Sequence, residues 1–139
     1  MPIVSVTRMR IRSIRFVPLF YVHAQRVIAQ IRQAEGLIAG AVKNDGDLVY
    51  WTISLWRDDN AINAFAASGA HRSAMPRLQD WCSEAAMVRW AHDEPSLPDW
   101  QEVVERLRTD GQTSKLRHPG PNHTHLNYDA PSAGYSMRF

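Results

Sequence analysis

Residues 37–56, LIAGAVKNDGDLVYWTISLW, decide how this chain folds, because two apolar stretches flank a turn sequence. Asp45-Gly46 readily adopts the left-handed conformations of a tight turn, and the stretches 37–43 and 48–56 have the length of strands. The segment therefore predicts a β-hairpin. Its second strand has Val49, Trp51, Ile53 and Leu55 on one face and Tyr50, Thr52, Ser54 and Trp56 on the other. We expect helices to cover one face, and a partner or a ligand pocket to cover the other.

A strand and a helix precede the hairpin. Residues 3–12, IVSVTRMRIR, alternate in polarity, which predicts a strand with Arg8, Arg10 and Arg12 on one face. These arginines could hold an anion, or they could form a solvated or salt-bridged face. Residues 13–34 change to a period of 3.6 and predict a helix. His23 borders its apolar stripe, where a histidine is either a buried contact or a candidate site residue.

The stretch 56–81, WRDDNAINAFAASGAHRSAMPRLQDW, predicts a helix that is broken around His71. The first helix starts at Asp58-Asp59-Asn60 and stops at Ser68-Gly69, and Ser73 is the expected N-cap of the second, with Pro76 in its first turn. His71 is then expected in a kink, just before the positive end of a helix dipole. That position favours a neutral ring that can accept a proton or bind a metal. The alternative is that His71 caps the free N–H groups of the second helix.

Residues 85–91, AAMVRWA, predict a last strand and complete the order β-α-β-β-α-β. This order is typical of a ferredoxin-like α+β fold with an antiparallel sheet. A short helix should follow, starting near Ser96 and Asp99 and docking on the sheet edge or on a second subunit. We expect residues 1–110 to form one domain, and residues 111–139 to form a Pro-, Gly- and His-containing tail that needs a partner surface to be ordered.

Composition narrows the class of protein. The 139 residues are 45% apolar and 22% charged, which suits one globular domain. The net charge of +2, without a long basic run, gives no support to nucleic-acid binding. A single cysteine, Cys82, excludes an intramolecular disulfide, and no apolar run reaches the roughly 18 residues of a membrane span. We therefore expect a soluble, cytoplasmic protein.

The tail contains three histidines, His118, His123 and His125. Imidazoles are common ligands of transition metals, so a metal site in the tail is a hypothesis. No cysteine or carboxylate accompanies them at a recognisable spacing.

Four motifs carry a resemblance to a known group of proteins: WTISLW at 51–56, RDD at 57–59, AF at 64–65 and GAHRSAM at 69–75. They resemble the stand-alone dimeric α+β-barrel domains similar to antibiotic biosynthesis monooxygenases, especially an uncharacterised branch distantly related to spheroidene monooxygenase. The resemblance covers about residues 3–92. It implies a homodimer in which two ferredoxin-like subunits pair through the open faces of their sheets.

The resemblance also implies a function. Its superfamily includes cofactor-free oxygenases of polyphenolic substrates and haem-binding or haem-degrading enzymes. A monooxygenase-like oxidoreductase, or a protein that binds haem or another small aromatic molecule between sheet and helices, is therefore expected. His71 is the implied catalytic residue and, if haem is bound, its axial ligand. The implied substrate-binding residues are Trp51, Trp56, Arg8, Arg10, His23 and Arg72.

Two hypotheses from other classes remain open. The chain could be a non-catalytic small-molecule-binding or interaction module, in which His71 only caps a helix. It could also be a tautomerase-type isomerase, because removal of Met1 would expose Pro2 as an N-terminal proline at the start of a strand, and such a proline acts as a general base in that superfamily.

Overall fold

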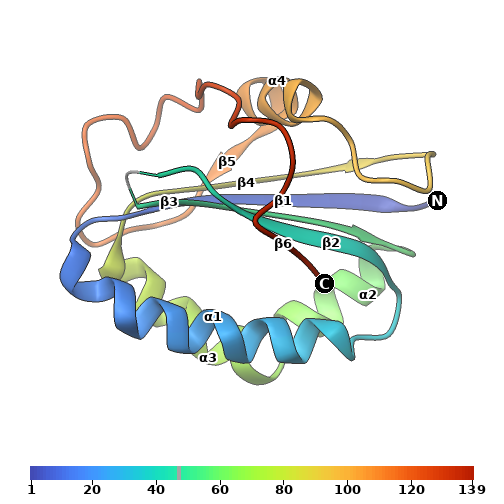
Figure 1. Cartoon of the computed structure of the whole chain (residues 1–139), viewed down its shortest axis with the longest axis horizontal. Helices are drawn as coiled ribbons and strands as arrows, with labels where there is room; N and C mark the ends of the chain where they lie inside the picture. Colours follow the sequence, from blue (N-terminus) through green and yellow to red (C-terminus); the bar gives the residue numbers. More distant parts are fainter. Residues whose placement is uncertain (47) are drawn as a thin grey trace.

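The computed structural model describes residues 1–46 and 48–139. Within these residues a sheet with the strand order β5-β4-β1-β3-β2-β6 separates two layers (Figure 1). Helices α1, α2 and α3 cover one face, and helix α4 lies over the other (Figure 1). The strands are β1 (Ile3–Ile11), β2 (Leu37–Asn44), β3 (Val49–Trp56), β4 (Cys82–Ala91), β5 (Gln112–Thr113) and β6 (Met137–Arg138). The helices are the 3-10 turn η1 (Ile14–Phe16), α1 (Val17–Arg32), α2 (Asp59–Ala66), α3 (Gly69–Trp81) and α4 (Trp100–Asp110).

The four long strands confirm the ferredoxin-like prediction. β1 is central and pairs antiparallel with both β3 and β4, while β2 pairs antiparallel with β3. The hairpin between β2 and β3 is present: the Asp45 amide donates to the Val49 carbonyl at 3.0 Å, and Gly46 has a φ of +69°. The following turn residue, Asp47, lies outside the described residues. None of the helices in the described ranges is long and apolar enough to cross a membrane.

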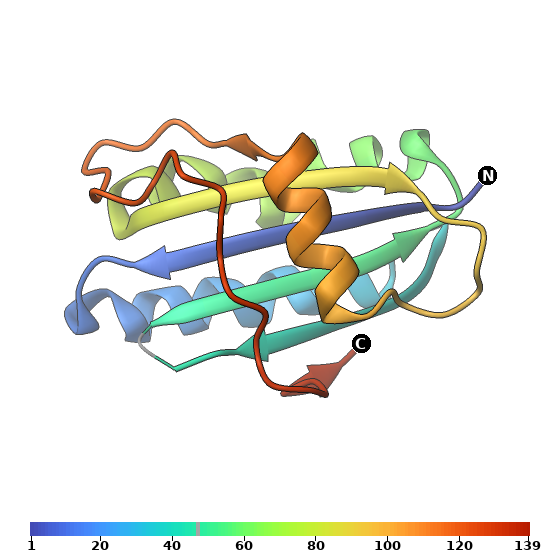
Figure 2. The ribbon, with the colours of Figure 1, turned by 90° about the horizontal axis from the view of Figure 1, so that it is seen from above.

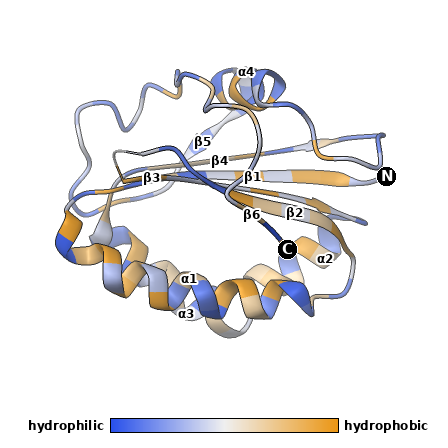
Figure 3. Cartoon of the chain, viewed as in Figure 1, coloured by the Kyte–Doolittle hydropathy of each residue, from blue (hydrophilic) through white to orange (hydrophobic). Residues whose placement is uncertain are grey.

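Helices α1 and α3 lie side by side beneath the sheet. Hydrophobic and hydrophilic colours alternate along α1 (Figure 3), as expected for a helix with one face toward a core. The apolar residues form two clusters, one around Phe20 and Trp81 and the other around Ile31 and Trp56. The core on the helix side therefore consists of two parts, which lie at different positions along the strands.

Helix α3 begins at Gly69, ahead of the predicted N-cap Ser73, so the prediction of a kink at His71 is wrong. His71 lies in the first turn of α3, and Pro76 lies inside the helix. The side chain of Gln30, from α1, replaces a local cap: its Oε1 accepts from the His71 amide at 2.9 Å, and its Nε2 donates to the Ser68 carbonyl at 2.9 Å. Because Gln30 is distant in sequence, no local pattern could reveal this cap.

The second face of the sheet is covered by the chain itself. Trp100, Val103 and Leu107 of α4 pack on this face, together with Tyr128 and other residues of the tail. In the view from above, the tail crosses the sheet and ends beside β2 (Figure 2). The predictions that α4 docks on the sheet edge or a second subunit, and that this face is open for a homodimer, are therefore wrong. The tail lies on its own sheet and pairs with β2.

Candidate functional site

A row of hydroxyl groups lies between the two apolar clusters on the helix side of the sheet. Ser5 of β1 pairs with Ser54 of β3 and with Arg89 of β4, and in the next row on this face Thr7 pairs with Thr52. Ser5, Thr7 and Thr52 stay partly accessible although they sit on central strands beneath helices. Apolar side chains would pack better at such positions, because polar groups lose hydration there. This hydroxyl floor, Ser5, Thr7, Thr52 and Ser54, marks the candidate site.

His71, in the first turn of α3, has one ring nitrogen that is fixed by a hydrogen bond. Its Nδ1 lies 3.0 Å from the carbonyl oxygen of Ala66. A carbonyl can only accept, so Nδ1 carries the proton and Nε2 carries the lone pair. Among the described residues, none hydrogen-bonds Nε2. His71 thus caps the C-terminus of α2, whereas the sequence suggested a cap for the N–H groups of the next helix.

The pKa of His71 is lowered from its ordinary value of 6.5. Burial is the main cause, the bond to Ala66 acts in the opposite direction, and the positive charge of Arg89 lowers the pKa further. His71 is therefore a neutral imidazole at pH 7, with a basic nitrogen that can take a proton from a bound molecule.

Aromatic rings connect His71 to the hydroxyl floor. The Phe65 ring lies 5.0 Å from the His71 ring and 5.4 Å from the Trp56 ring, centroid to centroid. Trp56 is almost fully buried, and its indole N–H donates to Ser54 Oγ at 2.8 Å. Of the predicted pocket walls, Trp56 therefore lies in this region.

Arg89 and Asn63 belong to the same region, although the sequence did not single them out. Nη1 of Arg89 donates to Oδ1 of Asn63, from α2, at 2.9 Å. No carboxylate pairs with Arg89 among the described residues, and its buried Nε has no hydrogen-bond partner there. An arginine that is only partly exposed, and lacks an acidic partner, is suited to an anionic oxygen of a ligand. The sequence did contain a signal for Arg89, because it is a charged residue at a helix-facing position of the strand predicted at 85–91.

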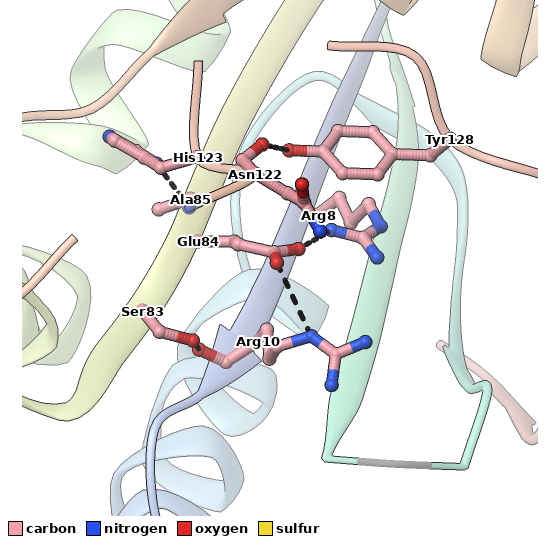
Figure 4. Close-up of polar contacts among 8 residues, drawn as sticks. All are labelled: Arg8, Arg10, Ser83, Glu84, Ala85, Asn122, His123 and Tyr128. Carbon is pink, nitrogen blue, oxygen red and sulfur yellow. Dashed lines mark hydrogen bonds and ion pairs between the residues drawn. The ribbon is translucent and has the colours of Figure 1, made fainter. Parts of the chain in front are cut away.

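Trp51, Arg8 and Arg10 lie on the opposite face of the sheet from His71, so they cannot share one pocket with it. Arg8 is buried: its Nη1 lies 2.6 Å from Glu84, and its guanidinium stacks on the Tyr128 ring at 3.6 Å (Figure 4). Nε of Arg10 lies 3.5 Å from the same carboxylate. Trp51 is fully buried under α4. These residues form a structural core with a salt bridge, one of the two alternatives that the sequence left open.

The other two candidates also lie apart from the hydroxyl floor. His23 packs against Trp81 at 5.3 Å, and its pKa is lowered by burial and by the charges of Arg77 and Arg26. Arg72 is exposed on the outer side of α3. Pro2, the base of the tautomerase hypothesis, uses its carbonyl to accept from the amide of the buried His92 at 2.9 Å.

The tail histidines do not form a metal site among the described residues, where no cluster of three potential ligands occurs. His123 uses both ring nitrogens: Nδ1 accepts from the Ala85 amide at 3.3 Å (Figure 4), and Nε2 donates to the Ser114 carbonyl at 2.9 Å. His118 is exposed and lies 3.4 Å from Asp80. Cys82 is buried, and burial raises the pKa of its thiol to about 12, which makes it unreactive.

Haem would need a slot beside His71. Nε2 has the right chemistry for an axial ligand, because a backbone carbonyl holds the other nitrogen. However, the Phe65 ring packs against His71, and neither of two open hollows includes it. One hollow, of about 410 Å³, is lined by Met87, Val88, Arg89, Asp110 and Gln112, and the other, of about 600 Å³, follows the exposed side of α4. The residues around His71 do not fit haem as they are placed, so we derive no step through it.

The fold is ferredoxin-like, and solved structures of antibiotic biosynthesis monooxygenases share it, as the sequence resemblance predicted. The chain belongs to the family described as Domain of unknown function (DUF3291), whose model matches residues 23–133. No curated protein matches the sequence.

Solved structures are similar to this chain in fold. A conserved protein from Methanosarcina mazei Go1 has 16% identity and a TM-score of 0.60, with 67% of this chain and 94% of that chain covered. An antibiotic biosynthesis monooxygenase has 13% identity and a TM-score of 0.59, covering 66% and 99%. SnoaB, a cofactor-independent oxygenase from Streptomyces nogalater, has 16% identity and a TM-score of 0.55, covering 67% and 94%. At these identities the likeness shows the fold alone.

Proposed function

We propose that this protein is a monooxygenase-like oxidoreductase that acts on a small hydroxylated aromatic molecule bound between the sheet and helices α2 and α3. The observation that carries the proposal is the hydroxyl floor between two apolar clusters, with the free nitrogen of His71 nearby. The names of two fold neighbours, an antibiotic biosynthesis monooxygenase and a cofactor-independent oxygenase, support this reaction class.

Each group has a distinct role in the proposed site. Phe65 and Trp56 offer apolar ring surface, and the serine and threonine hydroxyls offer hydrogen bonds to ring oxygens. His71 Nε2 accepts the proton of a ring hydroxyl, and Arg89 stabilises the resulting oxyanion. The electron-rich anion then reacts with O2: one oxygen atom forms a new C=O bond on the ring, the other leaves as water with two hydrogens of the substrate, and the ring is oxidised to a quinone. This arrangement needs no bound cofactor for the proton transfer.

The test combines binding and oxygen uptake, with a panel of dihydroxynaphthalenes as probes. Binding is followed by calorimetry, and uptake with an oxygen electrode. Arg89→Gln should weaken binding about 10-fold or more, because a charge-assisted hydrogen bond contributes roughly 1.5–3 kcal/mol. His71→Gln should leave binding within a few-fold but lower the uptake rate by about 100-fold or more, the usual range for a general base.

Arg77→Gln is the matched control, because Arg77 is exposed on α3 and should change neither quantity. Oxygen uptake that is unaffected by His71→Gln would contradict the proposed role of His71. Binding that depends on Arg89 but is never followed by oxygen uptake would favour the non-catalytic binding module instead.

A further inference from the structure

The part of the sheet face that lies beneath α4 is apolar and buried. Val4, Val6, Trp51, Ile53 and Leu55 are each 0% exposed. Their cover comes from α4 and from tail residues Tyr128, Ala130 and Tyr135. An uncovered surface of this kind would associate with another molecule, because soluble monomers rarely expose large apolar patches.

The residues from Trp100 to Phe139, which we call the strap, also reach both edges of the sheet. β5 pairs with β4 at Ala86 and Met87, and β6 pairs with β2 at Ala41 and Val42. The strap therefore crosses the face as α4, reaches the β4 edge at β5, and crosses the face again to end at the β2 edge (Figure 2). Unpaired edges are sites where another chain can add a strand, so the strap occupies parts of these sites as well.

Specific contacts hold the strap along its whole path. Tyr128 stacks on Arg8, which Glu84 holds in place, and its hydroxyl donates to the Asn122 carbonyl at 3.3 Å (Figure 4). The Trp100 indole donates to the Gly134 carbonyl at 3.1 Å. Such side-chain contacts require one defined position of the tail, which distinguishes it from a loosely collapsed segment.

The end of the strap passes around the β2 edge. The Phe139 amide donates to the Gly40 carbonyl at 2.9 Å, and the Phe139 ring packs with the helix-side cluster around Trp56. A Cβ on residue 40 would collide with this ring, so glycine at that position makes room for it. The last residue of the strap is therefore anchored on the other side of the sheet from Tyr128.

A part of this chain about as long as the strap has no counterpart in three of the solved structures. They match about two thirds of this chain while 94% to 99% of their own length is covered. The segment from the start of β1 to the end of β4 also makes up about two thirds of this chain. The strap is thus an addition to a common four-stranded unit.

We infer that the strap acts as a built-in partner: it occupies the sheet face and keeps the chain monomeric, and a second copy can bind that face only when the strap is displaced. Mass action favours the strap. A tethered segment has an effective concentration on the order of 1 mM, about 100-fold above a second copy at roughly 10 µM. The closed chain therefore outcompetes association at ordinary protein concentrations.

Light scattering after size exclusion tests the first half of this inference on the full chain. Between about 5 and 200 µM the mass should stay at 15.8 kDa, and a dimeric mass would overturn the inference. Hydrogen exchange gives an independent check, because the Ser136 and Phe139 amides donate to Val42 and Gly40 carbonyls and should exchange at least 10-fold slower than in a free peptide. Exchange at the free-peptide rate would show that the strap is not in place.

A latch variant tests the second half. The double substitution Tyr128→Ala and Phe139→Ala removes the anchor on each side of the sheet, and circular dichroism checks that the variant remains folded. A folded variant should show concentration-dependent dimers, whereas Tyr21→Ala, on the exposed side of α1, should remain monomeric. A folded latch variant that stays monomeric at 200 µM would contradict the inference that a second copy fits the face. If the double variant does not fold, the single substitutions Tyr128→Ala and Phe139→Ala test the second half in the same way, and the mass and exchange of the unaltered chain decide the first half.

Discussion

The two faces of the sheet have opposite characters. The face under the strap is sealed: large aromatic and aliphatic side chains fill it, and its one buried carboxylate, Glu84, is paired with arginines. The face under α1–α3 has its apolar contacts split into two clusters, with the hydroxyl floor between them. One sheet therefore has a tightly packed face and a face with accessible hydrogen-bonding groups, and substitutions should separate the two.

The largest effect is expected in the sealed core. Leu107 is fully buried between α4 and the sheet, so Leu107→Ala should lower the free energy of unfolding by about 4 kcal/mol, through lost burial and the cavity left behind. Urea denaturation measures this. Leu19→Ala is the control, because Leu19 is 52% exposed and should cost less than about 0.5 kcal/mol. Equal losses for the two variants would mean that α4 is not packed as described.

A slightly smaller loss of unfolding free energy is expected when the buried ion pair is broken. Glu84→Gln leaves the buried guanidinium of Arg8 without a counter-charge and should cost about 3 kcal/mol. The matched control is Glu105→Gln, whose exposed pair with Arg108 spans 3.8 Å and should contribute less than about 0.5 kcal/mol. Replacing both charged partners, by Arg8→Met with Glu84→Leu, should recover much of the stability. A double variant as unstable as the single one would contradict this account of the pair.

The helix side should respond to pH. The pKa of His71 is lowered in the folded state, so the unfolded chain binds more protons as the pH falls. The stabilising contribution is fully present above about pH 6.5, and it is lost as the pH falls through the folded-state pKa. Unfolding free energies at pH 7.5 and 5.5 should therefore differ less in His71→Gln than in the unaltered chain. His23→Gln should also reduce the difference, since the pKa of His23 is lowered as well. An unchanged difference in His71→Gln would argue against a buried, neutral ring.

The smallest change in stability is expected at the hydroxyl floor. Thr7→Val keeps the shape of the side chain and removes a hydroxyl for which no partner is described, so the free energy of unfolding should change by less than about 0.5 kcal/mol. Binding of a dihydroxynaphthalene should weaken by several-fold, as measured by calorimetry. A large loss of stability without any effect on binding would make the floor a structural feature.

The sequence predicts the elements of this fold well, because their signals are local. The hairpin follows from its turn residues, and the ferredoxin-like order follows from the succession of periods. The start of α3 could not be predicted, because its cap is Gln30 of another helix. The covering of the second face also depends on long-range contacts, such as Tyr128 on Arg8, in a tail without apolar periodicity.

The candidate site was predictable only in part for the same reason. His71 and Trp56 were identified from sequence, and they lie together through the Phe65 ring. Trp51 and Arg8 were grouped with them, although alternation along the strands places them on the other face. Arg89 and Asn63 come from elements far apart in the chain, and only the folded structure brings them within hydrogen-bond distance.

Indole N–H resonances can test the assignment of functions to the two faces most directly. The chain has five tryptophans: Trp56 and Trp81 lie on the helix side, and Trp51, Trp90 and Trp100 lie under or within the strap layer. Titration of a dihydroxynaphthalene, followed by two-dimensional NMR, should shift the Trp56 indole and the His71 ring with one dissociation constant and leave Trp51 and Trp100 unchanged. Shifts confined to Trp51 and Trp100, or no saturable shift at Trp56, would contradict a ligand site on the helix side.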